Sequence, residues 1–106
     1  MRYPTPAAAL EALRTKPGVD VSMRDGWTIV SDPNERTVWS FTPASHPAYP
    51  AVVKRMVVTT PDAIGIRTSV LCGASPDACT HLVDEFKKLN ERMREALEAT
   101  AGELSI

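Results

Sequence analysis

The sequence lacks a large excess of either charge, and it lacks any apolar run long enough to cross a bilayer. Twelve basic and thirteen acidic residues leave a formal net charge of −1. Nucleic-acid-binding domains usually carry a strong basic excess, so this balance argues against binding of phosphate backbones by bulk charge. A membrane-spanning helix needs about 20 consecutive apolar residues, and the apolar runs here are shorter. We therefore expect no transmembrane segment and find no strong nucleic-acid signature.

The first residues do not predict a secretory signal, because no apolar segment as long as a signal h-region follows the first six residues. A cytoplasmic protein is therefore the default expectation. If Met1 is instead a start codon added after removal of a signal, the protein would be periplasmic or exported.

Metal-binding and catalytic motifs are missing as well. Cys72, Cys79 and His81 offer donor atoms. Residues 79 and 81 of one helix, however, point about 200° apart and cannot face the same metal ion. No fourth ligand lies at a zinc spacing, and no nucleophile-elbow sequence accompanies Ser45 and His46. The sequence therefore predicts no metal and no cofactor.

What is present fits one globular domain over residues 1–106. Apolar residues make up 43% of the chain and charged residues 24%, which is ordinary for a soluble globular protein. Thr5-Pro6 and Ser75-Pro76 each join an N-cap residue to a proline suited to the first helical position. They predict a short helix over 7–14 and a long helix from residue 76 to about residue 99. The long helix also carries apolar residues at helical spacing.

Five segments between these helices have the composition or alternation of strands, namely 19–23, 27–30, 37–42, 51–60 and 64–72. They predict an α+β fold with a four- to five-stranded antiparallel meander. The long C-terminal helix would pack on one face, with the short N-terminal helix beside it. A three-residue loop, 24–26, is preferred between the first two strands, because it puts Val21 and Met23 on the face of Trp27 and Ile29. A two-residue Asp25-Gly26 turn would separate them.

The fourth predicted strand carries apolar side chains on both faces, including Val52, Val53 and Val57. Such a strand is usually central or covered twice. Alternatively, its outer face meets another molecule, either a protein partner or a second copy in a homodimer. A helix longer than the strands could offer a further contact, because its last turns would overhang the sheet.

Two groups of residues are candidates for binding. The proline-rich segment 43–50 is stiff and presents His46 and Tyr49, whereas Arg55 and Arg67 supply positive charge in the sheet. The main hypothesis is a small non-catalytic binding or protein-interaction domain. One alternative is a small enzyme that uses His46 with Tyr49 or Asp62. Another is weak anion or nucleic-acid binding through Arg55 and Arg67.

Cys72 and Cys79 flank a short predicted link, which would bring their backbones close enough for a disulfide. Two buried free thiols are the alternative, because free cysteine is commonly buried. The segments His46-Pro47-Ala48 and 50–55, with the two cysteines, resemble small bacterial α+β proteins to which no activity is assigned. The resemblance covers about half of the chain. It implies an exported protein with a Cys72–Cys79 disulfide.

Overall fold

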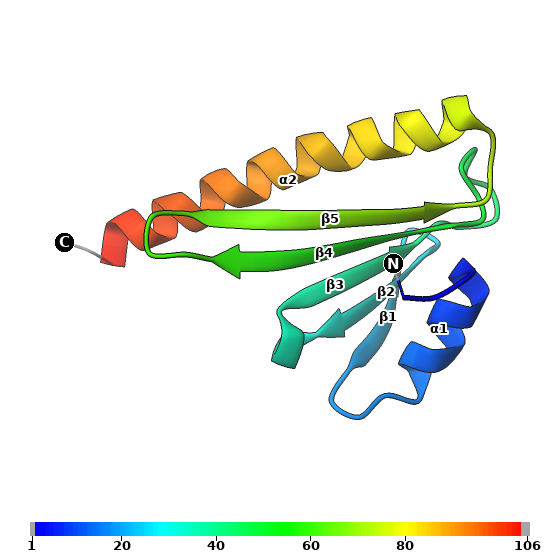
Figure 1. The fold of residues 1–106 in the computed structure, drawn as a ribbon, viewed down its shortest axis with the longest axis horizontal. Helices are drawn as coiled ribbons and strands as arrows, with labels where there is room; N and C mark the ends of the chain where they lie inside the picture. The colour runs from blue at the N-terminus through cyan, green and yellow to red at the C-terminus, as the bar shows by residue number, and fades with distance from the viewer. Residues whose placement is uncertain (1, 105–106) are drawn as a thin grey trace.

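The computed structural model describes residues 2–104 and contains two α-helices and a five-stranded antiparallel sheet (Figure 1). In chain order the elements are α1 (Pro6–Arg14), β1 (Asp20–Arg24), β2 (Trp27–Asp32), the 3-10 helix η1 (Pro33–Glu35), β3 (Thr37–Phe41), β4 (Ala51–Thr59), β5 (Ile64–Cys72) and α2 (Pro76–Leu104). Strands adjacent in the chain are adjacent in the sheet. The predicted α+β meander is confirmed, with five strands. Neither helix of the described chain is long and apolar enough to cross a membrane.

Both helices begin where the sequence predicts. The Thr5 hydroxyl accepts a hydrogen bond from the Ala8 N–H group at 3.1 Å, and the Ser75 hydroxyl accepts one from the Ala78 N–H group at 3.3 Å. The end of α2 differs from the prediction, because the helix continues to Leu104. Its 29 residues span about 43 Å, whereas the nine-residue strands β4 and β5 span about 30 Å. The last turn of α2 therefore projects past the β4–β5 turn (Figure 1).

The two helices cover opposite faces of the sheet, so the prediction that they lie side by side is wrong (Figure 1). The reason is visible in β4, where Val52 and Val53 are both fully buried although successive side chains of a strand point to opposite faces. The core on the α1 face consists of Ala9, Leu13, Val30, Trp39, Phe41 and Val52. The core on the α2 face consists of Ala48, Ala51, Val53, Leu82 and Phe86. Both faces of β4 are therefore covered at Val52 and Val53, whereas Val57 farther along the strand is only partly buried.

The turn between β1 and β2 also differs from the preferred prediction. Arg24 pairs with Trp27, which leaves the two-residue turn Asp25-Gly26. Both turn residues have positive φ, 52° and 84°, as a type I′ turn requires. Val21 and Met23 are consequently 43% and 67% exposed, while Trp27 turns to the α2 face. The preference for a three-residue loop assumed a single buried face, and that assumption fails when both faces have a core.

Asp32 at the end of β2 is buried, and its carboxylate accepts a hydrogen bond from the Lys16 ammonium at 2.6 Å. This hydrogen bond holds the pKa of Asp32 below its ordinary value, despite the opposing effect of burial. Ionised Asp32 therefore stabilises the fold above about pH 4, and this stabilisation is lost as the pH falls through the lowered folded pKa.

We expect the free energy of unfolding to fall as the pH is lowered below about 4, measured by urea denaturation at each pH. Asp32→Asn should flatten this dependence, because asparagine does not titrate. Asp62→Asn in the exposed β4–β5 turn is the matched control. A slope unchanged in Asp32→Asn would contradict the assignment.

Candidate functional site

A groove of about 800 Å³ lies between α2 and the neighbouring face of the sheet. Its apolar lining comes from both elements, with Trp27, Ile29 and Val38 on the strands and Phe86 and Leu89 on α2. We call this the α2 groove. It forms because α2 lies along β5 at one side of the sheet (Figure 1) and leaves the same face of β1, β2 and β3 largely uncovered. Its volume is in the range of small-molecule sites.

Arg55 on β4 is the partly buried charged residue of this groove, whereas the other charged residues that line it, Arg24, Asp25 and Glu85, are exposed. Its guanidinium carbon lies 4.9 Å from the centre of the Phe86 ring. Its Nε atom is buried and has no hydrogen-bond partner in the described chain. Burial lowers the pKa of Arg55 below its ordinary value. Arg55 also lines an adjoining hollow of about 270 Å³ beside Val57, Ile66 and Met93. A cation with an unused donor therefore lies between two largely apolar spaces.

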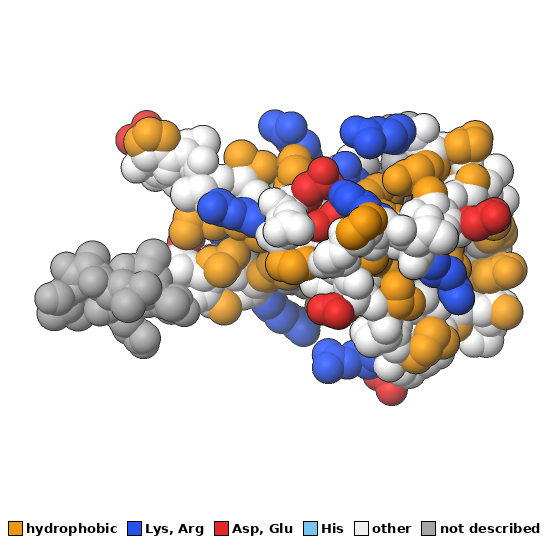
Figure 2. All heavy atoms as spheres, turned by 90° about the horizontal axis from the view of Figure 1, so that it is seen from below, with side chains coloured by type: hydrophobic (Ala, Val, Ile, Leu, Met, Phe, Trp, Pro, Cys, Tyr) orange, Lys and Arg blue, Asp and Glu red, His pale blue; other side chains and the backbone are white. Residues whose placement is uncertain are grey.

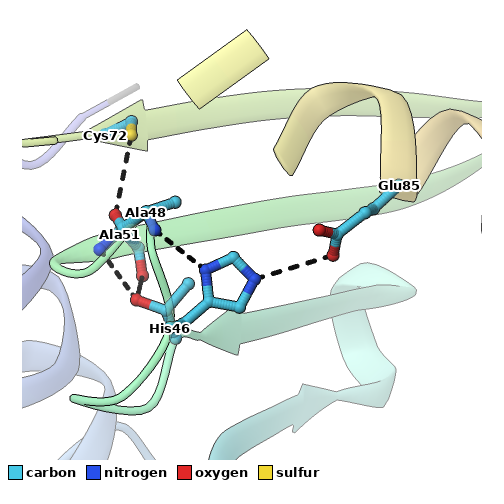
Figure 3. Close-up of polar contacts among 6 residues, drawn as sticks. His46, Ala48, Ala51, Cys72 and Glu85 are labelled. Carbon is cyan, nitrogen blue, oxygen red and sulfur yellow. Dashed lines mark hydrogen bonds and ion pairs between the residues drawn. The ribbon is translucent and has the colours of Figure 1, made fainter. Parts of the chain in front are cut away.

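Acidic groups at the groove lie nearer to water than Arg55. Asp25 is in the exposed β1–β2 turn, and the Glu85 side chain is 53% exposed. Glu85 is also turned toward His46, with 3.6 Å between its Oε2 atom and the His46 Nε2 atom (Figure 3). Neither carboxylate forms a salt bridge with Arg55.

His46 lies beside two residues that line the groove, Trp27 and Glu85, and its side chain is only 15% exposed. Its ring packs edge-on against Trp27, with ring centres 5.2 Å apart. Its Nδ1 atom accepts a hydrogen bond from the Ala48 N–H group at 3.0 Å (Figure 3). In the neutral ring the proton is then on Nε2, facing Glu85. Through the hydrogen bond from Ala48 and the contact with the Trp27 ring, His46 holds segment 43–50 against the groove wall.

The other predicted site residues are not gathered around His46. Tyr49 is 51% exposed and lines a separate hollow beside α1 with Pro6 and Leu10. Asp62 lies in the turn after β4, a strand of nine residues or about 30 Å from the end that adjoins segment 43–50. The structure therefore does not assemble the pairs His46–Tyr49 and His46–Asp62 that the enzyme alternative requires.

Arg55 and Arg67 are likewise separated. Arg55 pairs with Thr68, and Met56 pairs with Arg67, so the two arginines point to opposite faces of the sheet. Arg67 is exposed, whereas Arg55 is in the groove. On the face shown in Figure 2, basic side chains are interspersed with apolar and acidic ones and form no continuous patch. The predicted pair is thus not one surface, and Arg55 must be considered by itself.

The sequence alone does not mark Trp27, Phe86 and Glu85 as site residues. A pattern for part of the groove is nevertheless present. Phe86, Leu89 and Met93 recur at helical spacing on α2, while Trp27 and Ile29 alternate on β2. These patterns predict apolar faces, but they do not say that the two faces meet around Arg55.

Comparison of the chain with protein-family models, with curated proteins and with solved structures gives no match.

Proposed function

We propose that this chain is a non-catalytic binding domain and that the α2 groove holds a ligand with an apolar body and one anionic group. The observation that carries the proposal is the half-buried Arg55, whose Nε donor has no partner in the described chain, in a groove with apolar walls from both the sheet and α2. A buried charge without a counterion is costly, and an anionic ligand group would relieve that cost. Guanidinium is also well suited to carboxylate and phosphate groups, because its donors form a planar fork.

The walls of the groove support an apolar ligand body. Leu89 is 42% exposed, and Trp27, Ile29 and Val38 are only partly buried, all within the same hollow. Apolar side chains left open along one concave surface are typical of binding sites. The adjoining hollow extends the same surface past Val57 and Met93, so a chain-like body could occupy both with its anionic group at Arg55.

The test uses three probes with the same alkyl chain and different head groups: dodecanoate, dodecanol and dodecyltrimethylammonium. Calorimetric titration below the micelle concentration is expected to show the tightest binding for dodecanoate. In Arg55→Met, dodecanoate affinity should fall by about 10- to 100-fold, since a hydrogen-bonded ion pair is lost. Dodecanol affinity should be little changed, because methionine keeps the apolar wall.

Arg67→Met is the matched control, because it removes an arginine from the opposite face of the sheet. It should leave dodecanoate binding unchanged. We also expect Arg55→Met to unfold no more easily than the parent protein, because an unpaired, partly buried cation contributes little to stability. Equal affinities for dodecanoate and dodecanol, or equal losses in both arginine variants, would refute the proposed role of Arg55.

We further propose that the protein works in an oxidising compartment. Cys72 and Cys79 are paired in a disulfide, with their Cα atoms 6.0 Å apart, and structural disulfides persist mainly outside the cytoplasm. Mass measurement after alkylation in graded redox buffers tests this. A bond that persists below about −300 mV supports an exported protein. Two alkylated thiols under mildly oxidising conditions would support the cytoplasm.

A further inference from the structure

β1 is an open edge of the sheet. It is the first strand in the order, and all five of its side chains are exposed. The opposite edge strand, β5, lies along α2 (Figure 1). The molecule viewed from below, where Figure 1 places β1 and α1, shows apolar side chains between basic and acidic ones (Figure 2). An uncovered edge presents backbone donors and acceptors to another strand.

The backbone groups that face outward can be assigned from the turn. Arg24 and Trp27 flank the two-residue turn, so they form a hydrogen-bonded pair, and Ser22 with Ile29 is the next such pair along the ladder. The intervening residues, Val21 and Met23, therefore direct their N–H and C=O groups away from β2. No hydrogen bond from these backbone groups to another element of the described chain is present.

The sequence of β1, Asp20–Arg24, is complementary to itself in the antiparallel direction. When two copies are paired about Ser22, Asp20 faces the partner's Arg24, and Val21 faces the partner's Met23. The same register makes Val21 and the partner's Met23 exchange hydrogen bonds, which uses the groups that face outward. Asp20 and Arg24 form no salt bridge within the described chain, so both charges are free for the partner.

From this complementarity we infer that β1 pairs with β1 of a second copy of the chain, antiparallel and centred on Ser22. The pairing places two opposite-charge contacts and two Val–Met contacts across the axis, and such cross-strand pairs stabilise a sheet. Registers centred on Val21 or Met23 would also use the outward groups, but they would oppose Asp20 or Arg24 to the partner's Ser22. The charges therefore select the register.

The proposed β1–β1 pairing would change the shape of the α2 groove. The pairing itself does not depend on the ligand proposed for that groove. Paired residues of two antiparallel strands project to the same side, so the two grooves open on one face of the joined sheet. Ser22 and Arg24 line the groove in each copy. The two grooves would consequently meet across the Ser22 axis and form one longer trough.

The test is sedimentation equilibrium of the whole chain with charge-reversed variants. Two paired strands of five residues each should bury less than the roughly 1,200 Å² typical of stable complexes, so we expect a dissociation constant of about 10 μM to 1 mM. D20R and R24D should each weaken self-association by about tenfold or more, because like charges then oppose each other at two symmetric positions. An equimolar mixture of D20R and R24D should associate as tightly as the parent, and so should the double variant D20R/R24D.

Both positions are exposed, so each variant should keep the thermal midpoint of the parent protein. Cross-linking of the variant Ser22→Cys provides a second measurement. In the proposed pairing, residue 22 of one copy lies next to residue 22 of the other, so oxidation should give a disulfide-linked dimer. Thr68→Cys is the control, because residue 68 is exposed on β5, and it should not form a disulfide-linked dimer. A parent that stays monomeric at about 1 mM, or single reversals that leave association unchanged, would overturn the inference. So would a mixture of the two reversals that fails to associate.

Discussion

Leu82→Ala is expected to lower the free energy of unfolding by about 2–5 kcal/mol. Leu82 is fully buried between α2 and the sheet, in the core cluster with Val53 and Phe86. Its truncation removes apolar contacts and leaves a cavity that the surrounding residues fill only in part. The effect should be large because α2 is attached to the sheet through few fully buried side chains. Urea denaturation of the oxidised protein measures the change.

The chain offers a matched control on the same helix. Leu89 lies two turns after Leu82 and is 42% exposed, so Leu89→Ala should cost less than about 1 kcal/mol. Leu82→Met keeps most of the volume and should cost less than about 1.5 kcal/mol. If Leu82→Ala and Leu89→Ala had equal effects, α2 would not pack on the sheet as the structure describes.

Removal of the Cys72–Cys79 disulfide is expected to lower the free energy of unfolding by about 2–3 kcal/mol. The bond joins the end of β5 to the first turns of α2, across a sequence separation of 7 residues. It restricts the unfolded chain by closing this loop, and in the chain-entropy model even a small closed loop has an effect of this size. Cys72 also packs against the core under α2.

The double variant Cys72→Ala/Cys79→Ala and the chemically reduced parent protein should unfold at similar urea concentrations, both lower than the oxidised parent. The slope of the unfolding free energy against urea concentration reports the surface that becomes exposed on unfolding. A slope that differs between the oxidised and reduced proteins would therefore reveal a change in the unfolded state. An oxidised parent that unfolds together with its reduced form would show that the bond adds no stability.

The proposed binding site and the disulfide belong to the same part of the molecule. The disulfide fixes the start of α2, and Leu82 and Phe86 then hold the next turns against β4 and β5. Phe86 is also the ring beneath Arg55. Loss of either anchor should therefore weaken ligand binding together with stability, whereas Arg55→Met should weaken binding alone. This difference separates damage to the groove wall from loss of the anion contact.

Much of the fold follows from local sequence chemistry. Thr5-Pro6 and Ser75-Pro76 specify the starts of both helices, because an N-cap hydroxyl and a following proline favour a helical first turn wherever they occur. The five strands follow from alternation and β-branched composition.

The tertiary structure alone decided where these elements meet. Whether α1 lies beside α2 or on the other face depends on which apolar surface remains open after the sheet forms, and no local pattern carries that information. The presence of a core on both faces also determines the β1–β2 register, which places Trp27 on the α2 face. It also placed Arg55 in the groove and Arg67 on the opposite face. The sequence by itself therefore determined the elements and their order, whereas the candidate site depends on long-range packing of two faces against two helices.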